Sequence, residues 1–253
     1  MQFKYVNYEY NPAGYAVISF TNPNGKNVIN IDFINEINAI LDELYNNENC
    51  KAIVLKGRAD SFCIGMDFGK VNNENSDYSG ITAFITLMNR LHEYPTYILS
   101  VVEGEVMAGG MGLIAVSDYV ISKQTVHYSL PEAIWGLLPA VVFPYLSLKI
   151  GFNNAKKMTV LFNKITAEDA FSMGIADELS EMPELALKKV LSRLIKIRKE
   201  TIRRQKEFFC HVNKITPELT DYISDTAICQ MKNEQVIKDI ELFLKYGKFS
   251  WEK

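Results

Sequence analysis

Alternating apolar and polar residues at the start of the chain are typical of half-buried β-strands. Two such runs, residues 5–10 and 15–20, are separated by the turn-forming sequence Asn-Pro-Ala-Gly at residues 11–14, so the pattern predicts a β-hairpin. From residue 32 the apolar residues recur at helical spacing, which predicts a helix over residues 32–46 with Asp32 as its N-cap.

Short apolar runs and helical patterns then alternate along the chain. The runs at residues 52–55, 97–102 and 119–122 are typical of buried parallel strands. Between them lie a helical pattern over residues 80–93 and a glycine-rich turn that opens a short helix ending near Ser117. This alternation predicts βαβ units and places the protein in the α/β class.

The pattern becomes almost entirely helical after about residue 153. Residues 185–210 and 217–246 combine helical apolar spacing with many charges. We therefore divide the chain into an α/β core, residues 1–197, and a C-terminal helical region, residues 198–253.

Composition excludes several classes of protein. The chain has 253 residues, 48% of them hydrophobic and 23% charged, which is typical of a soluble globular protein rather than a disordered one. No apolar run suits a membrane span or a signal peptide, so we expect a cytoplasmic protein without a membrane partner. The net charge of −3 argues against a nucleic-acid partner. Four scattered cysteines and three histidines show no metal-ligand spacing, so we expect no metal site.

Two glycine-bearing segments follow predicted strands, at residues 61–68 and 104–112. Glycines at a helix start allow a ligand to approach bare backbone N–H groups, and the helix dipole favours an oxyanion there. Close packing of backbone on backbone is the alternative explanation for such glycines.

A third segment, residues 128–139, places the carboxylate of Glu132 among apolar residues. A carboxyl group in such surroundings has a raised pKa, which suits general acid–base chemistry. The alternative is an acid at a helix N-terminus after Pro131, stabilised by the dipole and without a chemical role.

In this order and spacing, the three segments resemble the crotonase (enoyl-CoA hydratase/isomerase) superfamily, as do residues 162–170 and 173–177. The resemblance implies a core built as a ββα superhelix (a spiral) with a C-terminal helical subdomain. It also implies a homotrimer or hexamer in which the C-terminal helices pack across subunits. No cofactor is expected, since the pantetheine of coenzyme A or of an acyl carrier protein is part of the substrate.

The resemblance also assigns roles to individual residues. The backbone N–H groups of Ile64 and Gly109 are expected to form an oxyanion hole for a thioester enolate. Further contacts with the thioester substrate are expected from the residues beside these donors, from the adenine-side turn and from the acyl-pocket segment: Gly65, Met66, Asp67, Gly110, Lys26, Val28, Arg90 and His92. Arg90 or His92 would meet a substrate carboxylate, with Lys56 and Arg58 as rivals.

The sequence departs from a typical hydratase at one position. Hydratases of this family carry two glutamates, of which the second matches Glu132 and the first falls on Gly112. Glycine cannot transfer a proton, so a site with one acid–base group is expected, which suits an elimination or an isomerisation. Candidates for a second proton carrier are Tyr78, Tyr97, His92 and His127.

Residues 106–112, 129–132, 136–140 and 248–252 are similar to one subgroup, the dehydratases of polyketide β-branching. These act after a hydroxymethylglutaryl synthase and convert 3-hydroxy-3-methylglutaryl on an acyl carrier protein to the 3-methylglutaconyl thioester. The alternatives are an enoyl-CoA isomerase or hydratase, the decarboxylase of the same cassette, and a non-catalytic binding protein with this fold.

A basic run lies between Lys188 and Lys206, despite the negative net charge. Such a run would steer an acidic carrier protein towards the enzyme. The alternative is an ordinary solvated helix face.

Overall fold

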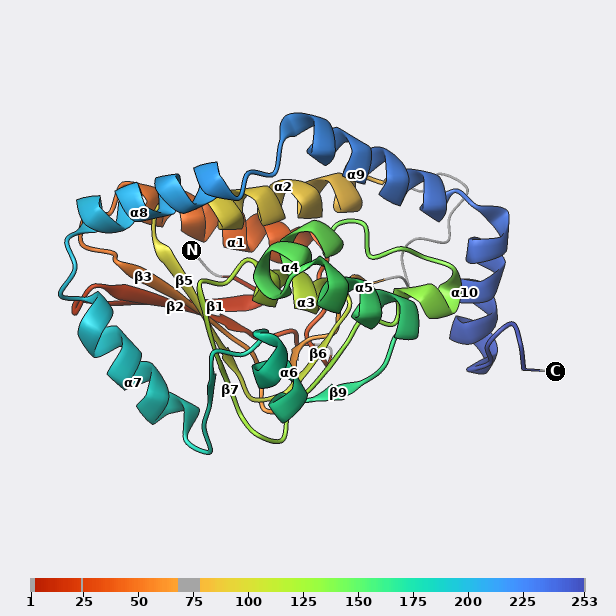
Figure 1. The fold of residues 1–253 in the computed structure, drawn as a ribbon, viewed down its shortest axis with the longest axis horizontal. Helices are drawn as coiled ribbons and strands as arrows, with labels where there is room; N and C mark the ends of the chain where they lie inside the picture. The colour runs from red at the N-terminus through yellow and green to blue at the C-terminus, as the bar shows by residue number, and fades with distance from the viewer. Residues whose placement is uncertain (1–2, 24, 68–77, 253) are drawn as a thin grey trace.

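The computed structural model describes residues 3–23, 25–67 and 78–252 of the chain. Two sheets form its framework (Figure 1). The larger has the strand order β1-β2-β3-β5-β7-β10, formed by Val6–Asn11, Tyr15–Phe20, Ala52–Lys56, Tyr97–Val102, Tyr119–Ser122 and Glu178–Leu179. The smaller has the order β4-β6-β8-β9, formed by Ser61–Cys63, Glu105–Met107, His127–Ser129 and Ile165–Thr166.

The chain winds between the two sheets as a spiral. The predicted hairpin is present, since β1 and β2 pair antiparallel. Strands β3, β5 and β7 then add in parallel to the larger sheet, and each is followed by one strand of the smaller sheet, β4, β6 or β8. Helices complete the first two of these turns. This arrangement confirms the predicted α/β class and the ββα superhelix.

Helices occupy both faces of the larger sheet. In chain order α1 to α5 are Ile31–Tyr45, Ser79–Glu93, Gly109–Ala115, Phe143–Ile150 and Phe152–Leu161. Helices α6 to α10 are Ala167–Met173, Pro183–Leu194, Lys199–Val212, Pro217–Met231 and Glu234–Tyr246. A 3₁₀ helix, η2, spans Glu132–Trp135. The main core lies under α1 and α2, and a smaller core lies under α7 on the opposite face (Figure 1).

Helix boundaries differ from the predicted ones in two places. Helix α1 begins at Ile31 because Asn30, and not Asp32, is its N-cap: the Asn30 side chain accepts a hydrogen bond from the backbone N–H of Phe33 at 2.9 Å. Each of the two long helical patterns at the C-terminal end divides into a pair of helices. The basic run is accordingly split between α7 and α8.

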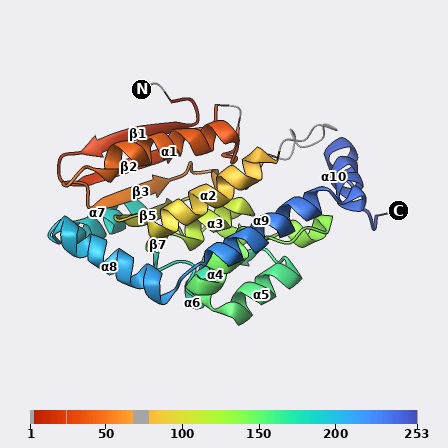
Figure 2. The ribbon, with the colours of Figure 1, turned by 90° about the horizontal axis from the view of Figure 1, so that it is seen from above.

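Helices α8 and α9 lie along α2, on its outer side (Figures 1 and 2). Side chains of α9 complete the wall of the site described below. In the described part of the chain no helix is both long enough and apolar enough to cross a bilayer.

Two lysines of the basic run attach α8 to the core instead of facing solvent. The Lys206 ammonium lies 2.6 and 2.8 Å from the two carboxylate oxygens of Asp118. Asp118 in turn accepts a hydrogen bond from the backbone N–H of Ile98 at 2.7 Å. Lys199 is buried and donates to the carbonyl of Cys50 at 2.6 Å. These two charges therefore serve packing within the chain.

We expect Lys206→Met to lower the free energy of unfolding by about 3 kcal/mol, because the partly buried Asp118 carboxylate loses its cation. Urea unfolding measures this difference. Arg204→Met is the control: its side chain is 77% exposed and pairs with Glu200 on the surface, so the change should stay below about 1 kcal/mol. Equal effects of the two substitutions would contradict a structural role for Lys206.

Candidate active site

An apolar cavity of about 250 Å³ lies between the start of α2 and the end of α9. Its walls come from six separate parts of the chain. The lining consists of Ile29, Asn30, Ile31, Met66, Asp67, Tyr78, Ser79, Gly80, Ile81, Phe84, Ala108, Gly109, Glu132, Leu137, Leu138, Pro139, Ala140, Val141, Val142, Ala227, Gln230 and Met231. All three segments that the sequence singled out contribute to it.

The two glycine-bearing segments touch each other at the cavity wall. Gly65 has φ of +96°, and a Cβ atom there would lie 2.7 Å from the Cβ of Ala108. A Cβ atom on Gly109 would lie 3.4 Å from the Cα of Gly65. No side chain fits between the two backbones, so polar backbone groups beside this contact stay uncovered.

Hydrogen bonding shows which backbone N–H groups are free here. Ile64 donates to the carbonyl of Asn27 at 2.9 Å, and Asp67 donates to the carbonyl of Ile29 at 3.1 Å. Met66 lies between these two donors and lines the cavity, and its N–H has no acceptor among the described residues. The same holds for the N–H of Gly109, the first residue of α3.

The prediction for Ile64 is therefore wrong in this geometry. Its N–H is occupied by Asn27, and its side chain is not part of the cavity lining. The positive φ of Gly65 turns the chain so that Ile64 and Asp67 both donate to the neighbouring 27–29 segment. Met66 and Gly109 are the residues of the two segments that line the cavity with N–H groups lacking an acceptor among the described residues.

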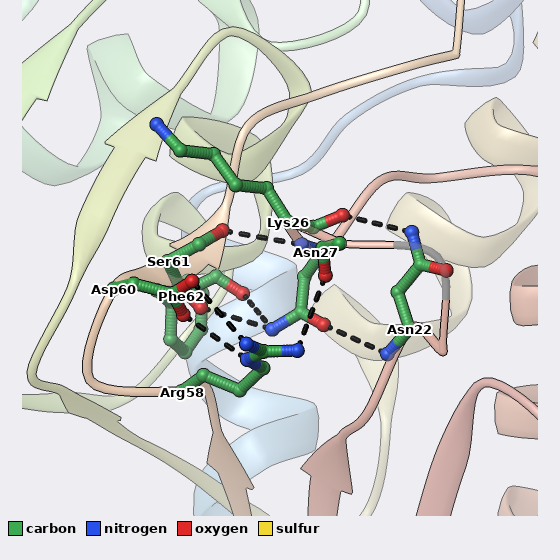
Figure 3. A network of polar contacts seen from close by, with 8 residues as sticks. Asn22, Lys26, Asn27, Arg58, Asp60, Ser61 and Phe62 are labelled. Atoms are coloured by element: carbon green, nitrogen blue, oxygen red, sulfur yellow. Dashed lines mark hydrogen bonds and ion pairs between the residues drawn. The ribbon is translucent and has the colours of Figure 1, made fainter.

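The side chain of Asn27 attaches the loop after β2 to β4, the strand that leads into the 64–67 segment (Figure 3). Asn27 is 1% exposed, and its amide donates to the carbonyls of Ser61 and Phe62 at 2.9 and 3.1 Å. Its side-chain oxygen accepts from the backbone N–H of Asn22 at 3.0 Å. These bonds, together with the carbonyl that binds Ile64, fix the loop after β2 against β4.

Lys26 and Val28 lie in the same loop but outside the cavity lining. The Lys26 ammonium is exposed and pairs with Glu105 at 2.9 Å. Lys164 reaches the other oxygen of Glu105 at 3.0 Å, and hydrogen bonds from these two lysines lower the pKa of the Glu105 carboxyl.

Glu132 begins η2 and is 7% exposed. Its Oε2 atom is buried and has no hydrogen-bond partner among the described residues. Burial raises the pKa of this carboxyl from its ordinary 4.5 to about 7. A carboxyl with this pKa, facing an apolar cavity, takes up and releases protons near neutral pH.

The position expected for a second glutamate is a glycine in tight apolar surroundings. A Cβ atom on Gly112 would lie 3.0 Å from the Met88 Cε and 3.2 Å from the Val142 Cγ2. A side chain at residue 112 would therefore require Met88 and Val142 to shift, and the side chains next to it are apolar. Gly110 serves packing, since a Cβ atom there would lie 2.1 Å from the carbonyl oxygen of Cys63.

Arg90 and His92 do not meet the cavity, contrary to their predicted contact with substrate. The Arg90 guanidinium donates to the side chain of Asn38 at 2.8 Å and pairs with Asp42 at 2.5 Å, which ties α2 to α1. The His92 ring packs against Tyr145, and burial lowers the pKa of its imidazole. The helical face that carries both residues is turned towards neighbouring helices.

Of the candidates for a second proton carrier, Tyr78 lines the cavity, whereas Tyr97 and His127 do not. The hydroxyl of Tyr97 donates to Gln205 at 2.6 Å, and the His127 side chain is exposed on β8. The two rival cations are paired elsewhere, Lys56 with Glu184 and Arg58 with Asp60. Within the described ranges no group of three His, Cys, Asp or Glu side chains is arranged to hold a metal ion.

Sequence reasoning missed the wall formed by the end of α9, with Ala227, Gln230 and Met231. It also missed Asn27. Neither carried a motif: the α9 residues follow ordinary helical spacing, and Asn27 looks like a loop asparagine. The buried hydrogen bonds of Asn27 exist only once β4 lies beside the loop.

Asn27→Ala should lower the free energy of unfolding by about 2–3 kcal/mol, since several buried backbone groups lose their partner. It should also lower kcat, because the loop whose carbonyls bind Ile64 and Asp67 loses its attachment to β4. Chemical unfolding and turnover assays measure both effects. Asn49→Ala, an exposed loop asparagine, is the matched control and should change neither. Wild-type stability in Asn27→Ala would refute the supporting role.

Comparison with known proteins gives the family. Residues 11–253 match the enoyl-CoA hydratase/isomerase family. The bacillaene synthase dehydratase PksH of Bacillus subtilis is 28% identical over 244 residues, covering 95% of this chain and 94% of that protein. The enoyl-CoA hydratase AFT6-1 of Alternaria alternata is 26% identical over 183 residues, covering 72% and 61% of the two proteins.

Solved structures agree with the fold described above. The crystal structure of the polyketide biosynthesis enoyl-CoA hydratase PksH from Bacillus subtilis has a TM-score of 0.91 at 25% identity, covering 98% of this chain and all of that one. An enoyl-CoA hydratase from Mycobacterium avium has a TM-score of 0.84 at 18% identity, covering 95% and 96%. Relatives named as hydratases and dehydratases mark the chain as an enzyme of the lyase type. The chain therefore belongs to the enoyl-CoA hydratase/isomerase family, the crotonase superfamily.

Proposed function

We propose that this enzyme removes water from a 3-hydroxy-3-methylglutaryl thioester, carried on an acyl carrier protein, to give the 3-methylglutaconyl thioester in polyketide β-branching. The observation that carries the proposal is the pairing of one buried, unpartnered carboxyl, Glu132, with free backbone N–H groups on the wall of the same apolar cavity. The relative PksH, whose name describes a dehydratase of bacillaene synthase, supports this choice of reaction.

The first step is removal of a proton from the α-carbon. The thioester carbonyl oxygen binds to the N–H groups of Met66 and Gly109, and the Glu132 carboxylate takes the α-proton. The C–H electron pair moves into the enolate, so negative charge develops on the oxygen that these donors face. Donors aimed at a charge that exists only along the reaction stabilise the transition state more than the ground state.

The second step expels the β-hydroxyl. The enolate electrons form the α,β double bond while the β-carbon–oxygen bond breaks, and the leaving hydroxyl takes a proton and departs as water. Protonated Glu132 supplies that proton if elimination is syn, and it returns to the carboxylate. If elimination is anti, the Tyr78 hydroxyl is the cavity group able to supply the proton. Because residue 112 is a glycine, which carries no carboxylate, the two-glutamate water addition of a typical hydratase is not available at this position.

A single carboxyl also suits a Δ3,Δ2-enoyl-CoA isomerase, which would use Glu132 to move a proton from the α- to the γ-carbon. The two reactions differ in product: dehydration releases water and lowers the mass of the acyl chain, whereas isomerisation leaves it unchanged. Mass spectrometry of the 3-hydroxy-3-methylglutaryl and a 3-enoyl thioester, assayed side by side, separates them.

Glu132→Gln should lower kcat for dehydration about 10³-fold, because the amide cannot accept the α-proton. In the wild type, kcat/KM should rise with pH and level off above about 7, since the base must be ionised and burial raises the pKa of Glu132 to about 7. Glu168→Gln, an exposed acid on α6, should leave both unchanged. Undiminished turnover by Glu132→Gln would sink the role of Glu132.

We also propose that the chain assembles as a homotrimer or hexamer. Helix α5 and the residue after it expose a group of large apolar side chains, Phe152, Val160, Leu161 and Phe162, between 44% and 61% exposed. Exposed apolar patches of this kind are typical of interfaces. Light scattering should give three or six times the chain mass of 28.8 kDa. A monomer at micromolar concentration would contradict the proposal.

A further inference from the structure

The acyl group proposed above ends in a free carboxylate at the end distal to the thioester, and the cavity must bind it. Within the described part of the chain, the cavity lining includes no lysine, arginine or histidine. Arg90 and His92, the sequence candidates for this task, bind other helices. A carboxylate placed against an apolar wall without a cation or donor would lose hydration without compensation.

One cation does touch the lining. Lys232 is the C-cap residue of α9, and its ammonium nitrogen lies 5.4 Å from the centroid of the Tyr78 ring. Tyr78 lines the cavity, as do Gln230 and Met231, the two residues before Lys232. Lys232 has no carboxylate partner among the described residues. Its charge is therefore held at the cavity rim by an aromatic face and is free to bind an anion.

Gln230 adds neutral donors on the same wall. Its side-chain oxygen accepts a hydrogen bond from the backbone N–H of Leu138 at 2.8 Å. Since that oxygen is occupied as an acceptor, the orientation of the amide is set, and its NH₂ group remains available. Among the described residues this NH₂ group has no acceptor, although Gln230 is part of the lining.

We propose that Lys232 and Gln230 form a subsite for the distal carboxylate of the acyl group, beside Tyr78 and on the wall of the cavity that also holds Glu132. The inference rests on the proposed function and deepens it: the enzyme would select acyl thioesters that carry a terminal acid. The Lys232 ammonium supplies the charge, and the Gln230 amide supplies a hydrogen bond to one carboxylate oxygen. Neutral acyl chains of the same length would gain from neither group.

The test uses binding, so that it does not depend on turnover. Two unreactive pantetheine thioethers serve as probes: one ends in a carboxylate, and the other ends in a methyl group at the same position. Calorimetry on the wild type should show at least about tenfold tighter binding of the carboxylate probe. Lys232→Met should remove that preference, Lys232→Glu should reverse it, and neither should change binding of the methyl probe.

Lys238→Met is the matched control. It removes the same charge from α10, where the Lys238 side chain is 66% exposed and pairs with Glu234 at 3.7 Å. It should keep the wild-type preference. The subsite would be refuted if Lys232→Met bound both probes like the wild type, or if it lost affinity for both equally.

Turnover then separates this inference from the proposed function. If the wild type prefers the carboxylate probe through Lys232 but does not dehydrate the 3-hydroxy-3-methylglutaryl thioester, the subsite stands and the reaction is wrong. If the wild type dehydrates that thioester and Lys232→Met does so with unchanged kcat/KM and probe binding, the reaction stands and the subsite is wrong.

Discussion

The site depends on the close approach of two backbones that belong to successive turns of the spiral. Gly65 meets Ala108 and Gly109 at a distance that leaves no room for a Cβ atom on Gly65. Ala108 adopts a positive φ of 48° to make this contact, a strained conformation for a residue with a side chain. The surrounding structure holds it there, partly through the hydrogen bond from the Ala108 N–H to the Ser129 carbonyl at 3.1 Å. Met66 and Gly109, whose N–H groups have no acceptor among the described residues, line the cavity beside this contact.

Glu132 shows the cost of such a site. A buried carboxyl without a partner lowers stability when it is ionised, and burial therefore raises its pKa to about 7. The folded chain holds that proton more tightly than the unfolded chain does. The stability that the folded chain gains by holding this proton is fully present below pH 4.5, and it is lost as the pH rises through about 7. The burial that lowers stability when Glu132 is ionised is therefore also what raises its pKa to near neutral pH, where the carboxyl can transfer protons.

Patterns that depend on local spacing were readable from the sequence. The hairpin and helices α1 and α2 follow from apolar periodicity, because burying one face of an element requires that periodicity. The parallel strands follow from short continuous apolar runs, because such strands are buried on both faces. Two errors had a common origin. Asn30 instead of Asp32 caps α1, and Met66 instead of Ile64 keeps a free N–H, because both depend on which partner a group finds in three dimensions. A motif gives the residue types but not their hydrogen bonds.

By itself, the sequence determined the α/β class, the carboxyl at residue 132 and the absence of one at residue 112, because these follow from residue type and from spacing along the chain. The spiral arrangement of the core came from the resemblance to a known family. Tertiary structure alone decided which N–H groups open onto the cavity, that Arg90 and His92 face other helices, and that the end of α9 brings Lys232 to Tyr78. The physical reason is that charges and donors are used by whichever partner is nearest in space. Residues 78 and 232 become neighbours only when α9 packs along α2.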